Sequence, residues 1–146
     1  GKYFDDLVQT VADFRDAEVH MAFLNLFDIS DIRVKRDYIK TYVDVVLSNT
    51  KGKQLVYSMI SLCEAFYYEY KIPGMKTTQV KDTANILKSC FVKVLPDYYK
   101  SNLEDKVSKA NYGEPPVKKL LITLLQDASK KVHKIGLGDI FGGFFR

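Results

Sequence analysis

The chain has 146 residues, of which 47% are hydrophobic and 27% are charged, and its formal net charge is +4. This length and composition are typical of one soluble globular domain, and they exclude intrinsic disorder and collagen-like repeats. No uninterrupted apolar run reaches the ~20 residues that cross a bilayer, which excludes a transmembrane helix.

Hydrophobic residues recur at helical spacing along nearly the whole chain, and alternating strand-like runs are missing. We therefore predict an all-α fold, a single compact bundle of six or seven helices. We expect residues 1–136 to form the helical domain and residues 137–146 to form an apolar C-terminal tail rich in Gly and Phe.

The first apolar residues of the chain form two successive helical faces. Arg15 and Asp16 separate these faces, but no Gly or Pro breaks the chain there. One bent helix and two short helices are both open, and we favour two. The two faces are Phe4, Leu7, Val8, Val11 and Phe14, followed by Val19, Ala22, Phe23, Leu26 and Phe27.

Two helices are predicted in the middle of the chain. Ser30 is a suitable N-cap for a helix that continues to about residue 49. The next helix, over residues 53–71, has apolar residues on so wide a face that we expect it to be the central helix. The predicted buried faces are Ile32, Ile39, Tyr42, Val43 and Val46 in the first, and Leu55, Met59, Leu62, Cys63, Phe66 and Tyr70 in the second, with Val56, Ile60 and Tyr67 beside them.

The second half of the chain begins with a turn at residues 73–74. Thr77 or Thr78 caps the next helix, which we expect to end at Pro96 because proline lacks the backbone N–H of a helix interior. A weaker amphipathic helix follows over residues 97–110, and Pro116 is suited to the first turn of a last helix that ends near Gly136. The inward faces are Val80, Ala84, Leu87, Phe91 and Val94, then Tyr99, Leu103 and Val107, then Val117, Leu120, Leu121, Leu124, Leu125, Ala128, Val132 and Ile135.

The two cysteines, Cys63 and Cys90, lack the close spacing of metal-binding motifs. If their helices formed an antiparallel hairpin, the two Cα atoms would be offset along the axis by roughly 6 Å, which is marginal for a disulfide. A disulfide and two reduced, buried thiols both remain open. The even cysteine count and the absence of an initiator Met favour secretion, with a cytoplasmic location as the alternative.

Residues with the spacing of known catalytic motifs are absent from the sequence. His20 and His133 belong to no metal-binding pair, and neither a phosphate-binding glycine loop nor a GxSxG motif occurs. We interpret both histidines as solvated or hydrogen-bonded within the core. The sequence thus predicts no catalytic residue, no metal and no cofactor, and hence a protein that is not an enzyme.

Aromatic residues offer the first candidate binding site, since the chain has 10 Tyr and 9 Phe. Tyr42, Phe66, Tyr67 and Phe91 are the expected lining of a pocket between helices for a small, lipid-like hydrophobic ligand. The alternative is that these side chains simply fill the core.

The C-terminal tail is the second candidate site, because glycines separate its large apolar residues Ile140, Phe141, Phe144 and Phe145. The tail could pack on its own domain, bind a protein partner or another copy of the chain, or make weak membrane-surface contact beside the lysines at 130, 131 and 134.

The distribution of charge along the chain indicates which classes of partner to expect. Residues 1–73 carry a net charge of −2 and residues 74–146 a net charge of +6, but acidic residues interrupt the basic half. Because only four of the 22 basic residues are arginine, we predict no nucleic-acid partner. The sequence favours a non-catalytic interaction or effector protein that acts through a protein-binding helical surface; the alternative is a carrier of a small hydrophobic ligand.

Overall fold

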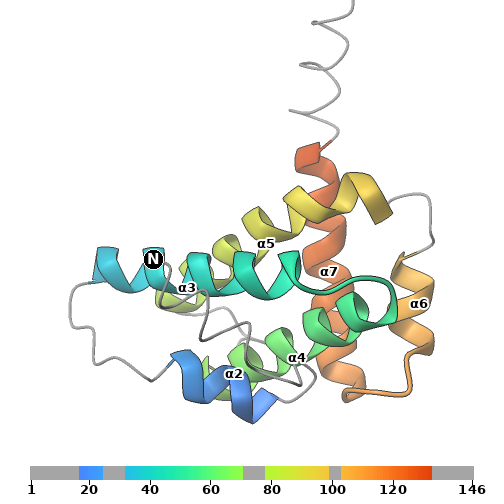
Figure 1. Cartoon of the computed structure of the whole chain (residues 1–146), viewed down its shortest axis with the longest axis horizontal. Helices are drawn as coiled ribbons and strands as arrows, with labels where there is room; N and C mark the ends of the chain where they lie inside the picture. Colours follow the sequence, from blue (N-terminus) through green and yellow to red (C-terminus); the bar gives the residue numbers. More distant parts are fainter. Residues whose placement is uncertain (1–16, 25–31, 71–77, 99–102, 133–146) are drawn as a thin grey trace, which may run out of the picture.

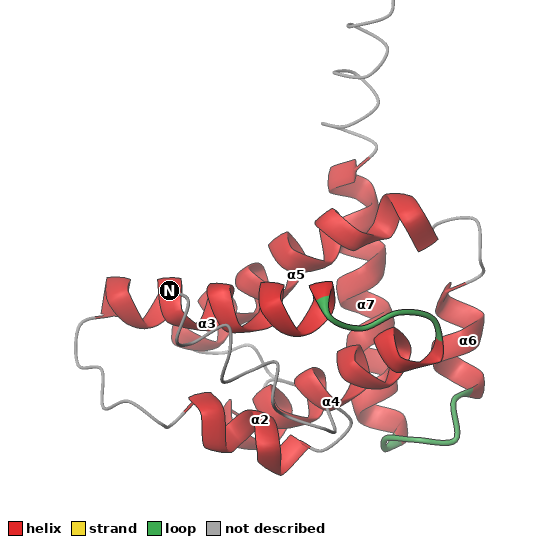
Figure 2. Cartoon of the chain, in the orientation of Figure 1, coloured by secondary structure: helices red, strands yellow, loops and turns green. Residues whose placement is uncertain are grey.

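The computed structural model describes residues 17–24, 32–70, 78–98 and 103–132. Within these ranges the chain forms six helices and no strand (Figures 1 and 2). The predicted all-α bundle is therefore confirmed. The residues at 1–16 and the whole predicted tail at 137–146 lie outside the described residues. The helices are α2 (Ala17–Leu24), α3 (Ile32–Ser48), α4 (Lys53–Tyr70), α5 (Thr78–Tyr98), α6 (Leu103–Lys109) and α7 (Pro115–Lys131).

Helix α4 is the central element, as its wide apolar face predicts. It packs against α2, α3, α6 and α7. Its predicted buried residues are in the core wherever the structure describes their side chains, and so are the predicted faces of α3 and α7. The fully buried large side chains are Tyr42, Leu55, Met59, Ile60, Leu62, Phe66, Leu87, Phe91, Leu121, Leu124 and Leu125.

Helices α4 and α5 do not form the antiparallel hairpin that was considered for the two cysteines. Helix α5 packs mainly against α3 and α7, and both of these helices also pack against α4 (Figure 1). The wide face of α4 is instead covered in part by α3 and α7, and α5 packs against these two helices.

Helix α5 also passes through Pro96 and ends at Tyr98, so the prediction that Pro96 ends the helix is wrong. A proline this close to the C-terminal end removes a single backbone hydrogen bond, the one to the carbonyl four residues earlier. Helix α6 is consequently shorter than the predicted helix over 97–110, although Leu103 and Val107 are buried as predicted. Tyr99 lies outside the described residues.

The buried face of α2 differs from the predicted one. Ala22 is exposed and Val19 is only half-buried, whereas the His20 side chain is fully buried. The prediction is therefore wrong for Ala22, and the side chains of Phe23, Leu26 and Phe27 lie outside the described residues.

The loop between α6 and α7 lies against α4. Gly113 has a φ of +82°, a backbone conformation that favours glycine, and Tyr112 packs edge to face on Tyr57 of α4. Pro115 and Pro116 then begin α7, which confirms the prediction for Pro116. None of the described helices is long and apolar enough to cross a membrane.

Candidate functional site

The aromatic residues predicted to bind a ligand belong to one region of the core. Tyr42, Phe66 and Phe91 are fully buried in the same cluster, and Tyr67 packs against it while half-buried. None of these four residues lines any of the three cavities described below. A ligand at this position would therefore have to displace packed core side chains.

His20 joins three helices through buried hydrogen bonds. Its Nδ1 atom lies 2.6 Å from the Tyr42 hydroxyl of α3, and its Nε2 atom lies 2.8 Å from Ser61 Oγ of α4. The Ser61 hydroxyl donates to the Ser58 carbonyl at 3.0 Å. With its proton directed there, Ser61 Oγ accepts from the Nε2 hydrogen, and Nδ1 of the neutral ring accepts from Tyr42.

Ser61 and His20 are close enough for a histidine to activate a serine nucleophile, as in hydrolases, but here Nε2 donates to Ser61 Oγ instead of accepting its proton. Both side chains are completely buried, however, and none of the three cavities reaches them. Burial also raises the pKa of Tyr42 far above its usual range, so its hydroxyl stays protonated and can donate. This arrangement stabilises the contact of α2 with α3 and α4.

The sequence analysis left the state of Cys63 and Cys90 open. In the structure both are free, buried cysteines, and the Cys90 thiol approaches the Lys40 carbonyl at 3.9 Å. Burial raises the pKa of Cys63 above its usual range and raises the pKa of Cys90 to about 12. Both groups are therefore protonated at neutral pH.

We expect both thiols to resist modification in the folded protein, because the thiolate is the reactive form and the side chains are buried. With an aromatic disulfide reagent at pH 8, the folded chain should react slowly, at a rate set by unfolding. In denaturant it should release two equivalents of thiol at once. Rapid modification of the folded chain would contradict the burial of the two thiols. If no thiol were released in denaturant, the two cysteines would be joined in a disulfide.

The largest of three hollows described here lies between the C-terminal part of α5, α6 and α7, and we call it the α6–α7 groove. Its volume is about 910 Å³. Leu95, Leu103, Ile122 and Leu125 provide its apolar base, and polar side chains surround them. The polar residues are Glu104, Asp105 and Ser108 on α6 and Gln126, Ser129 and Lys130 on α7.

The two walls of the α6–α7 groove differ in charge. Glu104 and Asp105 are exposed on the α6 wall, and Lys130 is exposed on the α7 wall. Asp105 also forms an exposed ion pair with Lys109 at 3.1 Å, a contact that contributes little to stability. The groove therefore presents acidic and basic groups on opposite sides of an apolar base.

Two smaller hollows adjoin the same helices. One, of about 570 Å³, lies between α6 and the start of α4, and Lys53, Lys106 and Lys109 are among its lining residues. The other, of about 470 Å³, lies beside Pro115 and Lys119 and is the most open of the three. Among the residues that the structure describes, no group of three or more His, Cys, Asp and Glu side chains could hold a metal ion.

Pattern reasoning missed part of the α6–α7 groove. Leu103 and Leu125 were predicted as inward-facing, but Leu95 and Ile122 were not. Ile122 carried a usable signal, since it is an apolar residue outside the buried stripe of α7. The predicted tail residues Ile140, Phe141, Phe144 and Phe145, like His133, lie outside the described residues.

No family model, no curated protein and no solved structure matches this chain. The class of protein therefore follows from its fold and its surface: an all-α bundle with an amphipathic groove.

Proposed function

We propose that this chain is a non-catalytic interaction domain that binds a short amphipathic helix of another protein in the α6–α7 groove. The observation that carries the proposal is the groove itself, an apolar base between polar walls of opposite charge. Its volume of about 910 Å³ can accommodate several apolar side chains. Recognition of a helix in a groove uses such anchors at positions i, i+3 or i+4, and i+7.

The charges on the two walls of the groove predict which side chains the partner helix carries along its edges. A basic side chain on one edge would face Glu104 and Asp105, and an acidic side chain on the other edge would face Lys130. Such charges fix orientation and raise the rate of association more than they raise affinity. The hydroxyl groups of Ser108 and Ser129 add hydrogen-bonding groups along the rim.

A groove-blocking variant tests this function. We expect peptides selected from a displayed library on the full chain to carry helical apolar spacing with charged edges. Ser108→Trp places a bulky side chain in the groove and should weaken their binding at least about tenfold, or ~1.4 kcal/mol. Ser48→Trp is the matched control, because Ser48 is also exposed but lies at the end of α3, away from the groove.

Calorimetric titration of the selected peptides gives the affinities, and circular dichroism checks that both variants fold. Peptides without helical spacing, or equal binding to the two variants, would contradict the proposal. Binding retained after deletion of residues 137–146 would remove the predicted tail from this function.

The alternative function is a carrier of a small hydrophobic ligand. Its support is that Tyr42, Phe66 and Phe91 belong to one continuous apolar cluster with Tyr67 at its edge. An apolar guest would enter only if this cluster opened, since the three innermost side chains are fully buried. Without saturable binding of a fluorescent fatty acid to the pure protein, this alternative fails.

A further inference from the structure

Helices α3 and α5 lie side by side and run in the same direction. Arg36 contacts Asp82, the Lys40 carbonyl accepts from Cys90, and Asp44 binds Lys93 at 2.7 Å, so higher residue numbers in one helix meet higher numbers in the other. The N-terminal halves of both helices therefore meet at one end of the bundle (Figure 1).

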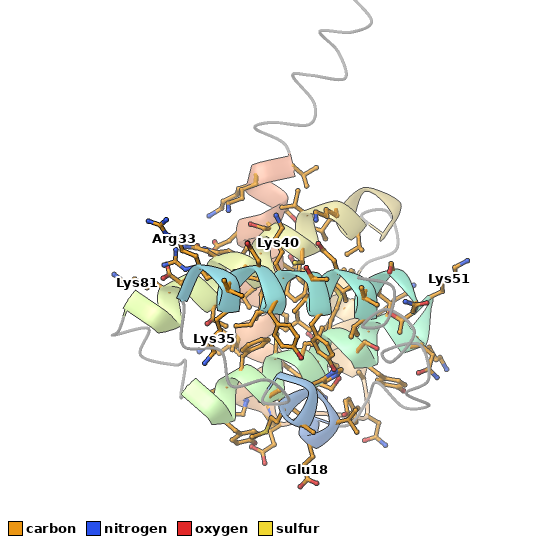
Figure 3. The ribbon with its side chains drawn as sticks, turned by 60° about the vertical axis from the view of Figure 1, so that its left-hand side comes forward. Glu18, Arg33, Lys35, Lys40, Lys51 and Lys81 are labelled. Carbon is orange, nitrogen blue, oxygen red and sulfur yellow. The ribbon has the colours of Figure 1, made fainter. Side chains whose placement is uncertain are left out.

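This end of the bundle is rich in cations. Arg33, Lys40 and Lys81 are exposed and Lys35 is half-buried. Figure 3 shows Arg33, Lys35 and Lys81 near the N-terminal ends of α3 and α5, whereas Lys40 lies further along α3 and on the other side of its ribbon from Lys35. Lys51 lies at the opposite end of the view. We call Arg33, Lys35, Lys40 and Lys81 the α3–α5 basic face.

Two carboxylates near this face already have cations of their own. Asp82 is paired with Arg36 and Asp44 with Lys93, so each of these two acids already has its own cation. Lys35, Lys40 and Lys81 take part in none of the ion pairs among the described residues. The first turns of α3 and α5 also contain no acidic residue. Lys35, Lys40 and Lys81 consequently contribute positive charge that attracts negatively charged groups.

The mixture of charges distinguishes between kinds of anionic partner. Asp37, Asp44 and Asp82 lie among the cations, and an unbroken row of phosphates would be repelled by these carboxylates. A polypeptide can space its carboxylates to meet the cations alone. Val34, which is 53% exposed between Arg33 and Lys35, offers such a polypeptide an apolar contact.

We propose that the α3–α5 basic face binds an acidic segment of a partner polypeptide. The proposal rests on the charges of α3 and α5, and it is independent of the α6–α7 groove. Recognition at such a face depends on ionic strength, because exposed charges are screened over about 10 Å at 0.1 M salt.

A charge-reversal experiment tests the proposal with the full chain and a fluorescein-labelled 15-residue peptide in which serines separate single glutamates and one leucine lies near the middle. We expect saturable binding at low salt that weakens as salt is added. The triple variant Lys35→Glu, Lys40→Glu and Lys81→Glu should lose at least about tenfold in affinity. The control variant Lys51→Glu, Lys53→Glu and Lys119→Glu has the same net charge and should lose less than about threefold.

Equal losses in the two triple variants would overturn the proposal, because net charge alone would then explain the binding. Absence of saturable binding to the peptide would overturn it as well. Two further probes, a 15-nucleotide single-stranded DNA and phosphatidylserine vesicles, decide between classes of partner. If either probe binds more tightly than the peptide and the triple variant weakens that binding, the partner is a nucleic acid or a membrane and not an acidic polypeptide.

Discussion

Replacing His20 with alanine is expected to lower the free energy of unfolding by about 3–5 kcal/mol. The imidazole ring is fully buried, and its removal leaves a cavity between α2, α3 and α4. It also removes the acceptor of the Tyr42 hydroxyl and the donor to Ser61 Oγ. Since small domains are stable by only about 5–15 kcal/mol, this loss is a large fraction of the total.

Chemical denaturation followed by circular dichroism measures the effect, and Tyr42→Phe provides the matched test. Alone, Tyr42→Phe should lower stability by about 1–2 kcal/mol, because it leaves the histidine nitrogen without its donor. Combined with His20→Ala it should lower stability much less, because the hydroxyl has already lost this partner. A loss below about 1 kcal/mol for His20→Ala, or fully additive effects, would contradict the hydrogen-bond network.

The second large effect is expected at Gly113. A Cβ atom added there would overlap Ile60 Cγ2, and the φ of +82° is a backbone conformation that residues other than glycine rarely adopt. Gly113→Ala should therefore lower the free energy of unfolding by about 2–4 kcal/mol, through backbone strain and displacement of Ile60 in the core.

Gly52→Ala is the control for Gly113→Ala. Gly52 also has a positive φ, of +58°, but an added Cβ would meet nothing within 4 Å. Its replacement should cost only the backbone strain, about 1 kcal/mol. Thermal unfolding of the two variants separates strain from steric conflict, and equal losses at both glycines would refute the close approach of the loop to α4. Ile60→Ala removes Cγ2 and should make Gly113→Ala less harmful.

Much of the fold follows from local patterns in the sequence. The stripes of α3, α4 and α7 are long and regular, and Pro116 is favoured where a helix begins, so these elements and their buried faces were predicted correctly. The other features of the fold depend on contacts between residues far apart in the sequence, which a local pattern does not encode. Continuation of α5 through Pro96 and the separation of α4 from α5 depend on tertiary packing. The burial of His20, one of two alternatives that the sequence left open, depends on partners 22 and 41 positions away.

The candidate sites also differ in how far the sequence could predict them. The aromatic cluster could be predicted because Phe66 and Tyr67 stand on one strongly periodic helix. The α6–α7 groove could not, because Leu95, Leu103 and Ile122 come from three helices whose relative placement the sequence pattern leaves open. The α3–α5 basic face likewise requires the parallel packing that brings Lys81 near Arg33 and Lys35.

The central claim is that the α6–α7 groove binds a helix of a partner protein. Its most direct test is an amide chemical-shift titration of the full chain with a peptide selected on it. We predict that the largest shift changes fall on residues 103–108 and 122–130, the two walls of the groove. Changes concentrated instead around Tyr42, Phe66 and Phe91 would contradict this account and favour a ligand within the core.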